Sequence, residues 1–390
     1  MSLRVWWRDP VNRIYVYAFF KNFAFFSAVL VPFFTDWGHV SLLQMQLLQS
    51  WFSVWVFVLE VPTGAVADKI GRKHSLILGS IFIAIATLLY GSIPTFANFL
   101  LAEFLFAIGY ALNSGADQAL LYDTLKSQGR EATAKQTLGR MDALTMAGML
   151  TAAILGSPIA SLWGLNAPQL MTAGPMLIAA LLAWLVPEPR LHSESESKRY
   201  LEVVKSGLVA IRTNPVVRTL AFDSVVVSVA AYFVVWYYQP YMQKLGIPIL
   251  YFGLAHAALL GCEIAASANF ATLEKILGKG KDYLRHSAIL VSLTFVIAAL
   301  FQHWVSLVLL IAIGGGLGYT RATYITALAN KHIDSRSRAT TLSSIAMLRR
   351  LALVPLNPLI GYVAGISMPL AFVVLSLFPL SSLFIKEAVE

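Results

Sequence analysis

The stretch GAVADKIGRK, residues 64–73, joins two apolar runs at 44–66 and 74–93. Each run supplies about the 20 apolar residues that a helix needs to cross a bilayer. The stretch that joins them is short and basic, and its glycines allow a tight turn. The sequence therefore predicts two membrane-spanning helices connected by a tight basic loop.

Similar apolar runs recur along the whole chain of 390 residues, of which 58% are hydrophobic and 13% charged. Soluble domains carry about 45–50% apolar and about 25% charged residues, so this composition excludes a single water-soluble globule. We predict an all-α integral membrane protein with twelve transmembrane helices. The runs lie near 12–34, 44–66, 74–93, 98–122, 137–163, 168–186, 216–238, 249–272, 287–303, 304–328, 340–364 and 367–385. The ninth and tenth almost touch, at Gln302-His303-Trp304.

The positions of Lys and Arg predict the orientation of the chain, because loops rich in these residues stay in the cytoplasm. The cations of the predicted loops gather on one side, and the opposite loops hold only Lys244. This one-sidedness requires an even number of spans and places both termini in the cytoplasm. The net charge of +9 is therefore a topology signal, and we expect no nucleic-acid partner.

One long polar connection, residues 187–214, divides the spans six and six. It predicts two pseudo-symmetric six-helix halves, residues 1–190 and 215–390, joined by a cytoplasmic linker at 191–214. An amphipathic segment of the linker is expected to lie along the inner headgroups. Its apolar face consists of Tyr200, Val203, Val204, Leu208 and Ile211.

Ionisable residues within the predicted spans follow a period of three. Such residues cost a few kcal/mol in hydrocarbon, so they normally face a bundle interior or a water-filled path. The third, sixth, ninth and twelfth spans carry none, which predicts that these spans face lipid while the others surround a polar pathway. The charged residues are Lys21, Glu60, Glu103, Asp117, Arg140, Asp142, Asp223, Glu263, Arg321, Arg349 and Arg350.

Depth in the membrane separates these residues further. Lys21, Glu263 and Arg349 lie about nine or more residues from a helix end, roughly 13 Å or deeper, and transporters bind solutes near the midplane. Desolvation allows a buried carboxylate to exchange a proton near neutral pH. The proton-coupling candidates are Glu263, Asp117, Asp223 and Glu60, and the substrate-cavity candidates are Lys21, Asn22, Arg321, Arg349 and Trp236. A fixed salt bridge is the alternative interpretation of each charge.

Residues 64–73 also match a family pattern. They fit G-x-x-x-D-[RK]-x-G-[RK]-[RK], directly after the second span, and in this respect the chain resembles the major facilitator superfamily. The segments EVPT at 60–63 and SGADQALLYD at 114–123 are similar to a drug-exporter-like bacterial branch of it. The resemblance implies a multi-pass protein of the bacterial inner membrane.

The resemblance further implies an inner gate. In the family, the acid at Asp68 faces a helix N-terminus of the opposite half, where the helix dipole favours an anion. The basic residue at Arg72 pairs with an acid at the end of the fourth span, which here is Asp123. Gly64 is expected to permit close helix contact and Gly71 a turn. The predicted gate motif comprises Gly64, Asp68, Gly71, Arg72, Lys73 and Asp123.

An enzyme is not expected, because the sequence contains no H-E-x-x-H, G-x-S-x-G or P-loop pattern. The single Cys262 excludes an internal disulfide and a Cys-based zinc cluster, and no cofactor is expected. The glycine run at 314–318 lies inside the tenth span, where close helix packing or a flexible point explains it better than a dinucleotide loop.

The predicted function is secondary transport of a small amphipathic solute by alternating access, with export in exchange for protons. The partial match of Gly156-Ser157-Pro158 to the family's antiporter signature favours export. Lys21, Arg321 and Arg349 would instead suit an organic anion, and a proton- or ion-coupled anion carrier is the alternative. A channel is a less favoured class. The expected partners are the solute, protons and the lipid bilayer, and the chain is expected to be a monomer.

Overall fold

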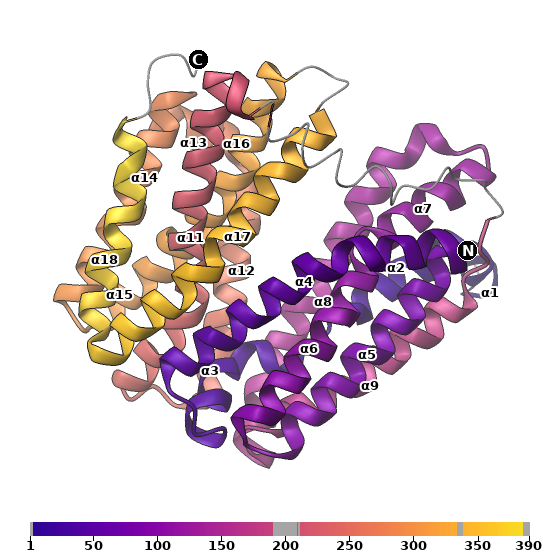
Figure 1. The fold of residues 1–390 in the computed structure, drawn as a ribbon, viewed down its shortest axis with the longest axis horizontal. Coiled ribbons are helices and arrows are strands. Elements are labelled where there is room, and N and C mark those ends of the chain that lie inside the picture. The colour runs from indigo at the N-terminus through magenta and orange to yellow at the C-terminus, as the bar shows by residue number, and fades with distance from the viewer. Residues whose placement is uncertain (1–2, 190–208, 210, 334–337, 385–390) are drawn as a thin grey trace. The chain divides into compact units, whose positions relative to one another are not determined.

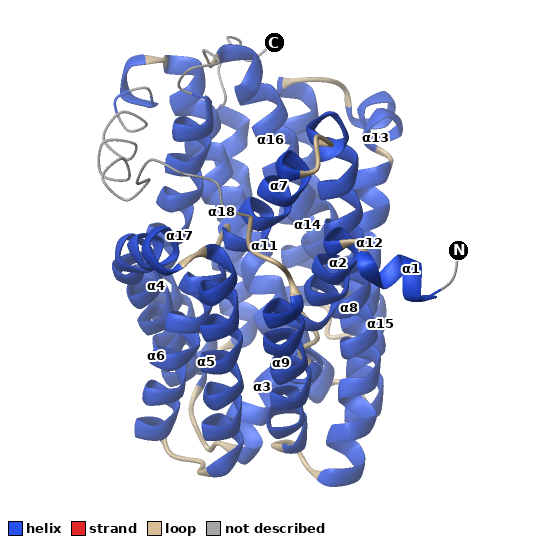
Figure 2. Ribbon diagram, turned by 90° about the vertical axis from the view of Figure 1, so that its right-hand side faces the viewer, coloured by secondary structure: helices blue, strands red, loops and turns tan. Residues whose placement is uncertain are grey.

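The structure is a computed structural model, and it describes residues 3–189, 209, 211–333 and 338–384 (Figure 1). These residues form helices and connecting loops, and none of them forms a β-strand (Figure 2). Ten of the described helices are long and apolar enough to cross a membrane, and a shorter apolar helix covers Met368–Phe384. The prediction of an all-helical membrane protein is confirmed.

The ten spans agree closely with the predicted runs. They lie at Pro10–Trp37, Leu42–Ala67, Arg72–Ser92, Phe96–Ser127, Glu131–Trp163, Ala167–Leu185, Pro215–Lys244, Ile249–Ala268, Lys281–Leu300 and Trp304–His332. The predicted eleventh and twelfth runs correspond to the helices α17 (Arg338–Ile366) and α18 (Met368–Leu380). The ninth span ends at Leu300 and the tenth begins at Trp304, so the boundary between them is confirmed.

The chain divides into two compact units. Unit 1 comprises Met1–His39 and Trp51–Arg199, and unit 2 comprises Val40–Ser50 and Tyr200–Glu390. The division at residue 199 falls inside the predicted linker. Most of the predicted amphipathic segment, including Tyr200, Val203, Val204 and Leu208, lies outside the described residues. Its last apolar residue, Ile211, is buried in the core of unit 2.

Unit 1 contains the first six spans. Its elements are α1 (Leu3–Arg8), α2 (Pro10–Lys21), η1 (Phe25–Val29), α3 (Leu30–Pro32), η2 (Phe33–Trp37), most of α4 (Leu42–Ile70), α5 (Arg72–Ser92), α6 (Phe96–Asn113), α7 (Ala116–Ser127), η3 (Glu131–Thr133), α8 (Ala134–Trp163) and α9 (Ala167–Leu185). Helix α5 packs against α6 and α9, and α2 packs against α8 and α9 (Figure 1). Buried apolar side chains of α2, α5, α7, α8 and α9 form a common core.

The start of helix α2 is held by Asp9, which lies just outside the membrane-spanning segment. The Asp9 carboxylate caps it by accepting the N–H of Val11 at 3.0 Å, and it pairs with Arg130 at 2.9 Å. Partial burial alone would raise the pKa of Asp9, but these two contacts outweigh burial and hold the pKa below its ordinary value. This stabilisation is present above the ordinary carboxyl pKa and is lost as the pH falls through the lowered one.

The exposed side of the third and sixth spans is apolar. On α9 the exposed large side chains follow the helical period, and on α5 they are likewise hydrophobic. They are Met171, Leu177, Ile178, Leu181 and Trp184 on α9, and Leu78, Ile85 and Leu88 on α5. This pattern supports the prediction that these two spans face lipid.

Unit 2 contains the last six spans. Its elements, besides α17, α18 and the start of α4, are α11 (Pro215–Lys244), η4 (Ile249–Tyr251), α12 (Phe252–Ala268), α13 (Phe270–Leu277), α14 (Lys281–Leu300), α15 (Trp304–Leu309), η5 (Leu310–Leu317), α16 (Gly318–His332) and η6 (Ser381–Phe384). Helix α14 packs along α18, α11 packs against α16, and α12 packs against η5 (Figure 1).

A proline in α17 explains how the start of α4 joins unit 2. Because Pro358 has no N–H, the carbonyl of Val354 loses its partner within the helix. Ser50 of α4 donates to this carbonyl at 2.7 Å. Nearby, a Cβ on Gly361 would lie 2.8 Å from the Cβ of Gln46, so the glycine is needed for the close approach of the two helices.

Candidate functional site

The first span is interrupted at its centre. Helix α2 ends at Lys21, and the chain resumes as a 3₁₀ segment at Phe25 after three residues without helical structure. The N–H of Phe25 is satisfied by the hydroxyl of Thr172 on α9, at 3.1 Å. Non-helical backbone at membrane depth is tolerated only where protein or a water-filled cavity surrounds it, so this break must lie inside the bundle or beside a cavity.

The fourth span is interrupted as well. Helix α6 ends at Asn113, Ser114 is extended, and Gly115 has a φ of 72°, in the left-handed region that favours glycine. Helix α7 then starts at Ala116, which places Asp117 in its first turn. Broken helices of this kind form the solute and ion sites of many transporters.

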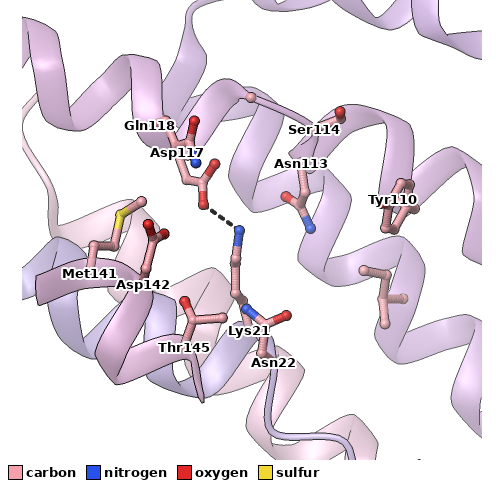
Figure 3. A pocket seen from close by; sticks show the side chains of 12 residues that line it. Lys21, Asn22, Tyr110, Asn113, Ser114, Asp117, Gln118, Met141, Asp142 and Thr145 are labelled. Atoms are coloured by element: carbon pink, nitrogen blue, oxygen red, sulfur yellow. Dashed lines mark hydrogen bonds and ion pairs between the residues drawn. The ribbon is translucent and has the colours of Figure 1, made fainter. Parts of the chain in front are cut away.

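The two breaks bring one ion pair together. Lys21 at the end of α2 pairs with Asp117 at the start of α7 (Figure 3). The C-terminal end of a helix favours a cation and the N-terminal end favours an anion. Both helix dipoles therefore stabilise the charge that the sequence places at each end. Lys21 also lies beside the ring of Tyr17, 6.0 Å from its centroid.

A cavity of about 350 Å³ in unit 1 surrounds this pair. Its lining combines charged, amide and hydroxyl groups from α2, α6, α7 and α8 and from the two breaks, while α5 contributes the apolar Ile83 (Figure 3). The lining residues are Lys21, Asn22, Ile83, Tyr110, Asn113, Ser114, Gly115, Asp117, Gln118, Met141, Asp142 and Thr145. The candidates Lys21, Asn22 and Asp117 thus meet at one polar site.

A second, more apolar cavity of about 200 Å³ adjoins the first. The two cavities share Lys21, Asn22, Ile83 and Tyr110. The remaining lining is mostly aromatic, methionine or small: Ala24, Phe26, Ser27, Phe106, Met149, Thr172 and Met176. Together the cavities offer a polar and an apolar compartment next to each other.

Two glycines of α8 hold the break in the first span in place. A Cβ on Gly148 would meet the carbonyl oxygen of Phe19, and a Cβ on Gly156 would meet that of Phe25. Only glycine allows α8 to approach the backbone of the first span so closely. Gly156, noted in the sequence as part of an antiporter-like signature, therefore supports the site by packing.

Unit 2 holds a corresponding ion pair, in which the first span carries the carboxylate and the fourth span carries the cation. Arg321 of α16 donates to Asp223 of α11 at 2.7 Å, and their side chains are 0% and 1% exposed. Arg321 also donates to Ser287, Ser382 and the carbonyl of Leu284, while Ser382 donates to Asp223. In this structure Asp223 and Arg321 are enclosed by protein, which favours the salt-bridge interpretation over their predicted roles in proton coupling and the substrate cavity.

The remaining candidates line neither of the two cavities. Glu60, Glu263 and Arg349 are half-buried, and the ring of Tyr319 is within electrostatic reach of Glu263 and Arg349. Trp236 is buried, with its ring 6.1 Å from that of Tyr232. Their roles stay predictions.

Sequence reasoning missed Asp142 as a site residue, although it noted the charge. Asp142 lies on α8 and shares the cavity with Lys21 and Asp117. The available signal was that the fourth and fifth spans each carry a carboxylate, Asp117 and Asp142, while the first span carries the lysine Lys21. Asn113, which accepts the hydroxyl of Tyr17 at 3.3 Å, carried no sequence signal.

The basic loop has the ion pair that the resemblance implied. Arg72 pairs with Asp123 at 2.6 Å, and Gly71 has a φ of 99°. The side chain of Asp68 lies outside the described part of the chain. Among the described residues, no atom lies within 4 Å of a Cβ built on Gly64, so the expected close helix contact is absent there.

A carboxylate that sequence reasoning did not select, Glu188, also contacts the loop. It accepts the N–H of Lys73 at 3.3 Å, lies 3.5 Å from the ring of His74, and would be the first group met by a Cβ on Gly71. A single acidic residue just after a span had no distinguishing pattern in the sequence. It anchors the start of α5 to the end of the sixth span.

The glycine run of the tenth span forms a π-helix, η5. A Cβ on Gly316 would lie 2.6 Å from the Cβ of Cys262, and one on Gly315 would lie 3.1 Å from Leu259. The prediction of close helix packing here is confirmed. No group of three His, Cys, Asp or Glu side chains suited to a metal ion occurs among the residues that the structure describes.

Comparison with known proteins gives one family. A family model described as Major Facilitator Superfamily matches residues 14–356. The solved structure of the nucleoside transporter NupG is similar at a TM-score of 0.78 and 13% identity, over 97% of this chain and 100% of that chain. A bacterial homolog of the human lysosomal transporter Spinster is similar at a TM-score of 0.73 and 17% identity, over 96% of this chain and 93% of that chain. The POT family transporter PepTSo is similar at a TM-score of 0.73 and 10% identity, over 96% of each chain. No curated protein matches the chain significantly.

Proposed function

Because this chain belongs to the major facilitator superfamily of secondary transporters, we propose that it exports a small amphipathic solute in exchange for protons. The observation that carries this proposal is the Lys21–Asp117 pair, which lines a cavity where two spans are broken. The solved relatives, named for nucleosides, for a lysosomal transporter and for the POT family, do not point to one substrate.

Asp117 is the best-supported carrier of the coupling proton. Its carboxylate lines a cavity, where a proton can reach it from water, and it pairs with Lys21. Asp223 lacks such access in this structure, because Arg321 and Ser382 enclose it. Glu263 is half-buried but lies outside both cavities.

We expect Asp117→Asn to lower proton-driven transport at least tenfold while exchange of solute for solute persists at saturating concentration. The amide cannot carry a proton, but it leaves the path for the solute open. The measurement uses proteoliposomes with and without a pH gradient, and a ligand first found by thermal stabilisation across organic cations and anions at two pH values.

Glu263→Gln is the matched control, since it neutralises another carboxylate candidate for proton coupling and should keep the pH response. If the control loses proton-driven transport and Asp117→Asn keeps it, the coupling site is Glu263 and the assignment to Asp117 is wrong.

The basic loop is proposed to act as the gate on the cytoplasmic side. The Arg72–Asp123 pair fixes the loop to the end of α7, and Asp68, whose side chain lies outside the described residues, is proposed to belong to the same gate. We expect Asp123→Asn to slow transport severalfold and to leave ligand affinity unchanged, because the pair lies outside the cavity lining.

Asp9→Asn is the control for the gate. It removes the carboxylate of a second ion pair in the same unit, with Arg130 at 2.9 Å, that is not part of the loop. Transport rates and ligand affinities of both variants are compared in proteoliposomes. Equal rates for the two variants would remove the special role of the Arg72–Asp123 pair.

The location and assembly of the protein follow the same proposal. The one-sided loop cations support a bacterial inner-membrane protein with both termini in the cytoplasm. Each six-span half has its own core and its own ion pair, which supports a monomer as the transporting unit.

A further inference from the structure

The first cavity holds two carboxylates and one ammonium group. Asp117 and Asp142 line it together with Lys21, and the other titratable side chain of its lining is Tyr110. Tyr17, on the same helix as Lys21, faces the pair from the core. When both carboxylates are ionised, the cavity therefore carries one excess negative charge.

Lys21 neutralises only one of the two carboxylates. It pairs with Asp117, whereas Asp142 has neither a hydrogen bond nor an ion pair with any residue that the structure describes. The Asp142 carboxylate nevertheless interacts electrostatically with both Lys21 and Asp117. Figure 3 shows the three side chains gathered around one space.

Lys21 has the mobility to serve either carboxylate. Its ammonium group sits on a flexible four-carbon stem, so it can turn without a change in the backbone. Its side chain is 17% exposed and borders both cavities, so there is room for this movement. No comparable freedom exists for Arg321, whose side chain is 0% exposed and held by four acceptors.

The adjoining apolar cavity shows what the rest of a ligand would contact. Phe26, Phe106, Met149 and Met176 offer aromatic and thioether surfaces next to Lys21 and Asn22. A ligand with a charged head in the first cavity would therefore place an apolar group of about one ring in the second, whose volume is about 200 Å³.

We propose that Lys21 switches between Asp117 and Asp142, and that Asp142 binds the cationic head of an amphipathic amine when Lys21 is held by Asp117. This inference rests on the proposed function and names its substrate class and its means of coupling. Protonation of Asp117 releases Lys21, which moves to Asp142 and displaces the amine. One proton thus enters the cavity as one monovalent cation leaves it.

The charges of this exchange balance at each step. A proton bonds to a carboxylate oxygen of Asp117, which becomes neutral, while Lys21 keeps its three protons and its charge. The cavity is neutral either with a bound amine or with a proton on Asp117. Occupancy by both at once would leave one excess positive charge, so the two ligands oppose each other as antiport requires.

The test uses tritiated phenethylamine as the cation, with 2-phenylethanol and 3-phenylpropionate as uncharged and anionic analogues of the same size. Binding to the purified full-length protein is measured at pH 8 and pH 5.5. We expect the amine to bind at least tenfold more tightly at pH 8 than at pH 5.5, and to compete with protons. Asp142→Asn should weaken amine binding at pH 8 at least tenfold and leave 2-phenylethanol binding unchanged.

A rescue experiment identifies the role of the lysine. Asp117→Asn mimics the protonated acid, so Lys21 should occupy Asp142 and weaken amine binding at least tenfold at pH 8. Adding Lys21→Gln removes the competing cation, and the double variant should recover to within threefold of the wild type and lose most of its pH dependence. Unchanged binding of 2-phenylethanol shows that each variant is folded.

Two results would overturn the switch. If Asp117 contacts the amine directly, the double variant will bind as weakly as Asp117→Asn alone. If the amine binds no better than 2-phenylethanol, or 3-phenylpropionate binds best, the substrate class is wrong. If the protein transports another solute in exchange for protons but the double variant does not recover amine binding, the proposed function stands and the switch is wrong. If the double variant recovers amine binding but no proton-driven transport occurs, the switch stands and the proposed function is wrong.

Discussion

Asp223→Ala is expected to destabilise the protein by about 3–5 kcal/mol, because it leaves the charge of Arg321 buried without its partner. The Arg321 side chain is 0% exposed, and its other acceptors are two hydroxyls and one carbonyl, which do not neutralise a charge. The loss should appear as a lower free energy of unfolding in mixed micelles and a lower thermal midpoint.

Two further variants make this expectation specific. In Asp223→Leu combined with Arg321→Met no charge remains buried, and replacement of a buried pair by apolar groups is often close to neutral. The double variant should therefore recover most of the lost stability. Asp117→Ala, which breaks the pair in unit 1, should lower the free energy of unfolding by less than half as much. Lys21 borders a cavity, and Asp142 still interacts with it electrostatically. A double variant no more stable than Asp223→Ala would contradict the buried-charge explanation.

The two pairs differ in access rather than in charge. Each unit joins its first and fourth spans by one cation and one carboxylate, with the cation on the first span in unit 1 and on the fourth in unit 2. In unit 1 the pair lies at two helix breaks and lines a cavity. In unit 2 it lies within a closed network of hydroxyl groups. The first arrangement suits a group that must exchange protons, and the second suits a structural lock.

Much of the fold could be predicted from the sequence, since apolar length alone located the spans. The narrow gap between the ninth and tenth spans could also be placed, because Gln302 and His303 interrupt the apolar pattern. The breaks in the first and fourth spans could not be predicted from the sequence. They depend on contacts between distant segments, such as the N–H of Phe25 with Thr172 of the sixth span.

The site was harder to predict for the same reason. Depth in the membrane ranked Glu263 first, but depth was counted along unbroken helices and says nothing about which side of a helix a residue occupies. The cavity is formed where the chain stops being helical, after Lys21 and at Ser114. Asp142 becomes important through its neighbours Lys21 and Asp117, which lie on other spans.

Gly156→Ala is expected to destabilise the protein by about 3 kcal/mol, the upper part of the usual range for overpacking, because the new methyl group would collide with backbone. Its Cβ would meet the carbonyl oxygen of Phe25 and lie 3.0 Å from the carbonyl carbon. A side chain could move aside, but this carbonyl belongs to the broken part of the first span. Helix α8 must therefore shift away from the break, and proton-driven transport should fall along with the thermal midpoint.

Gly139→Ala is the matched control on the same helix, where a new Cβ meets no described atom within 4 Å. In the absence of a clash, alanine stabilises a helix interior by about 0.5–1 kcal/mol relative to glycine. The same substitution at two positions of α8 should therefore change stability in opposite directions. Thermal unfolding of the two variants in detergent measures this, with proteoliposome transport as the second readout. Equal stability of the two variants would show that α8 does not need Gly156 to hold the break, and that the Lys21 site is positioned by other contacts.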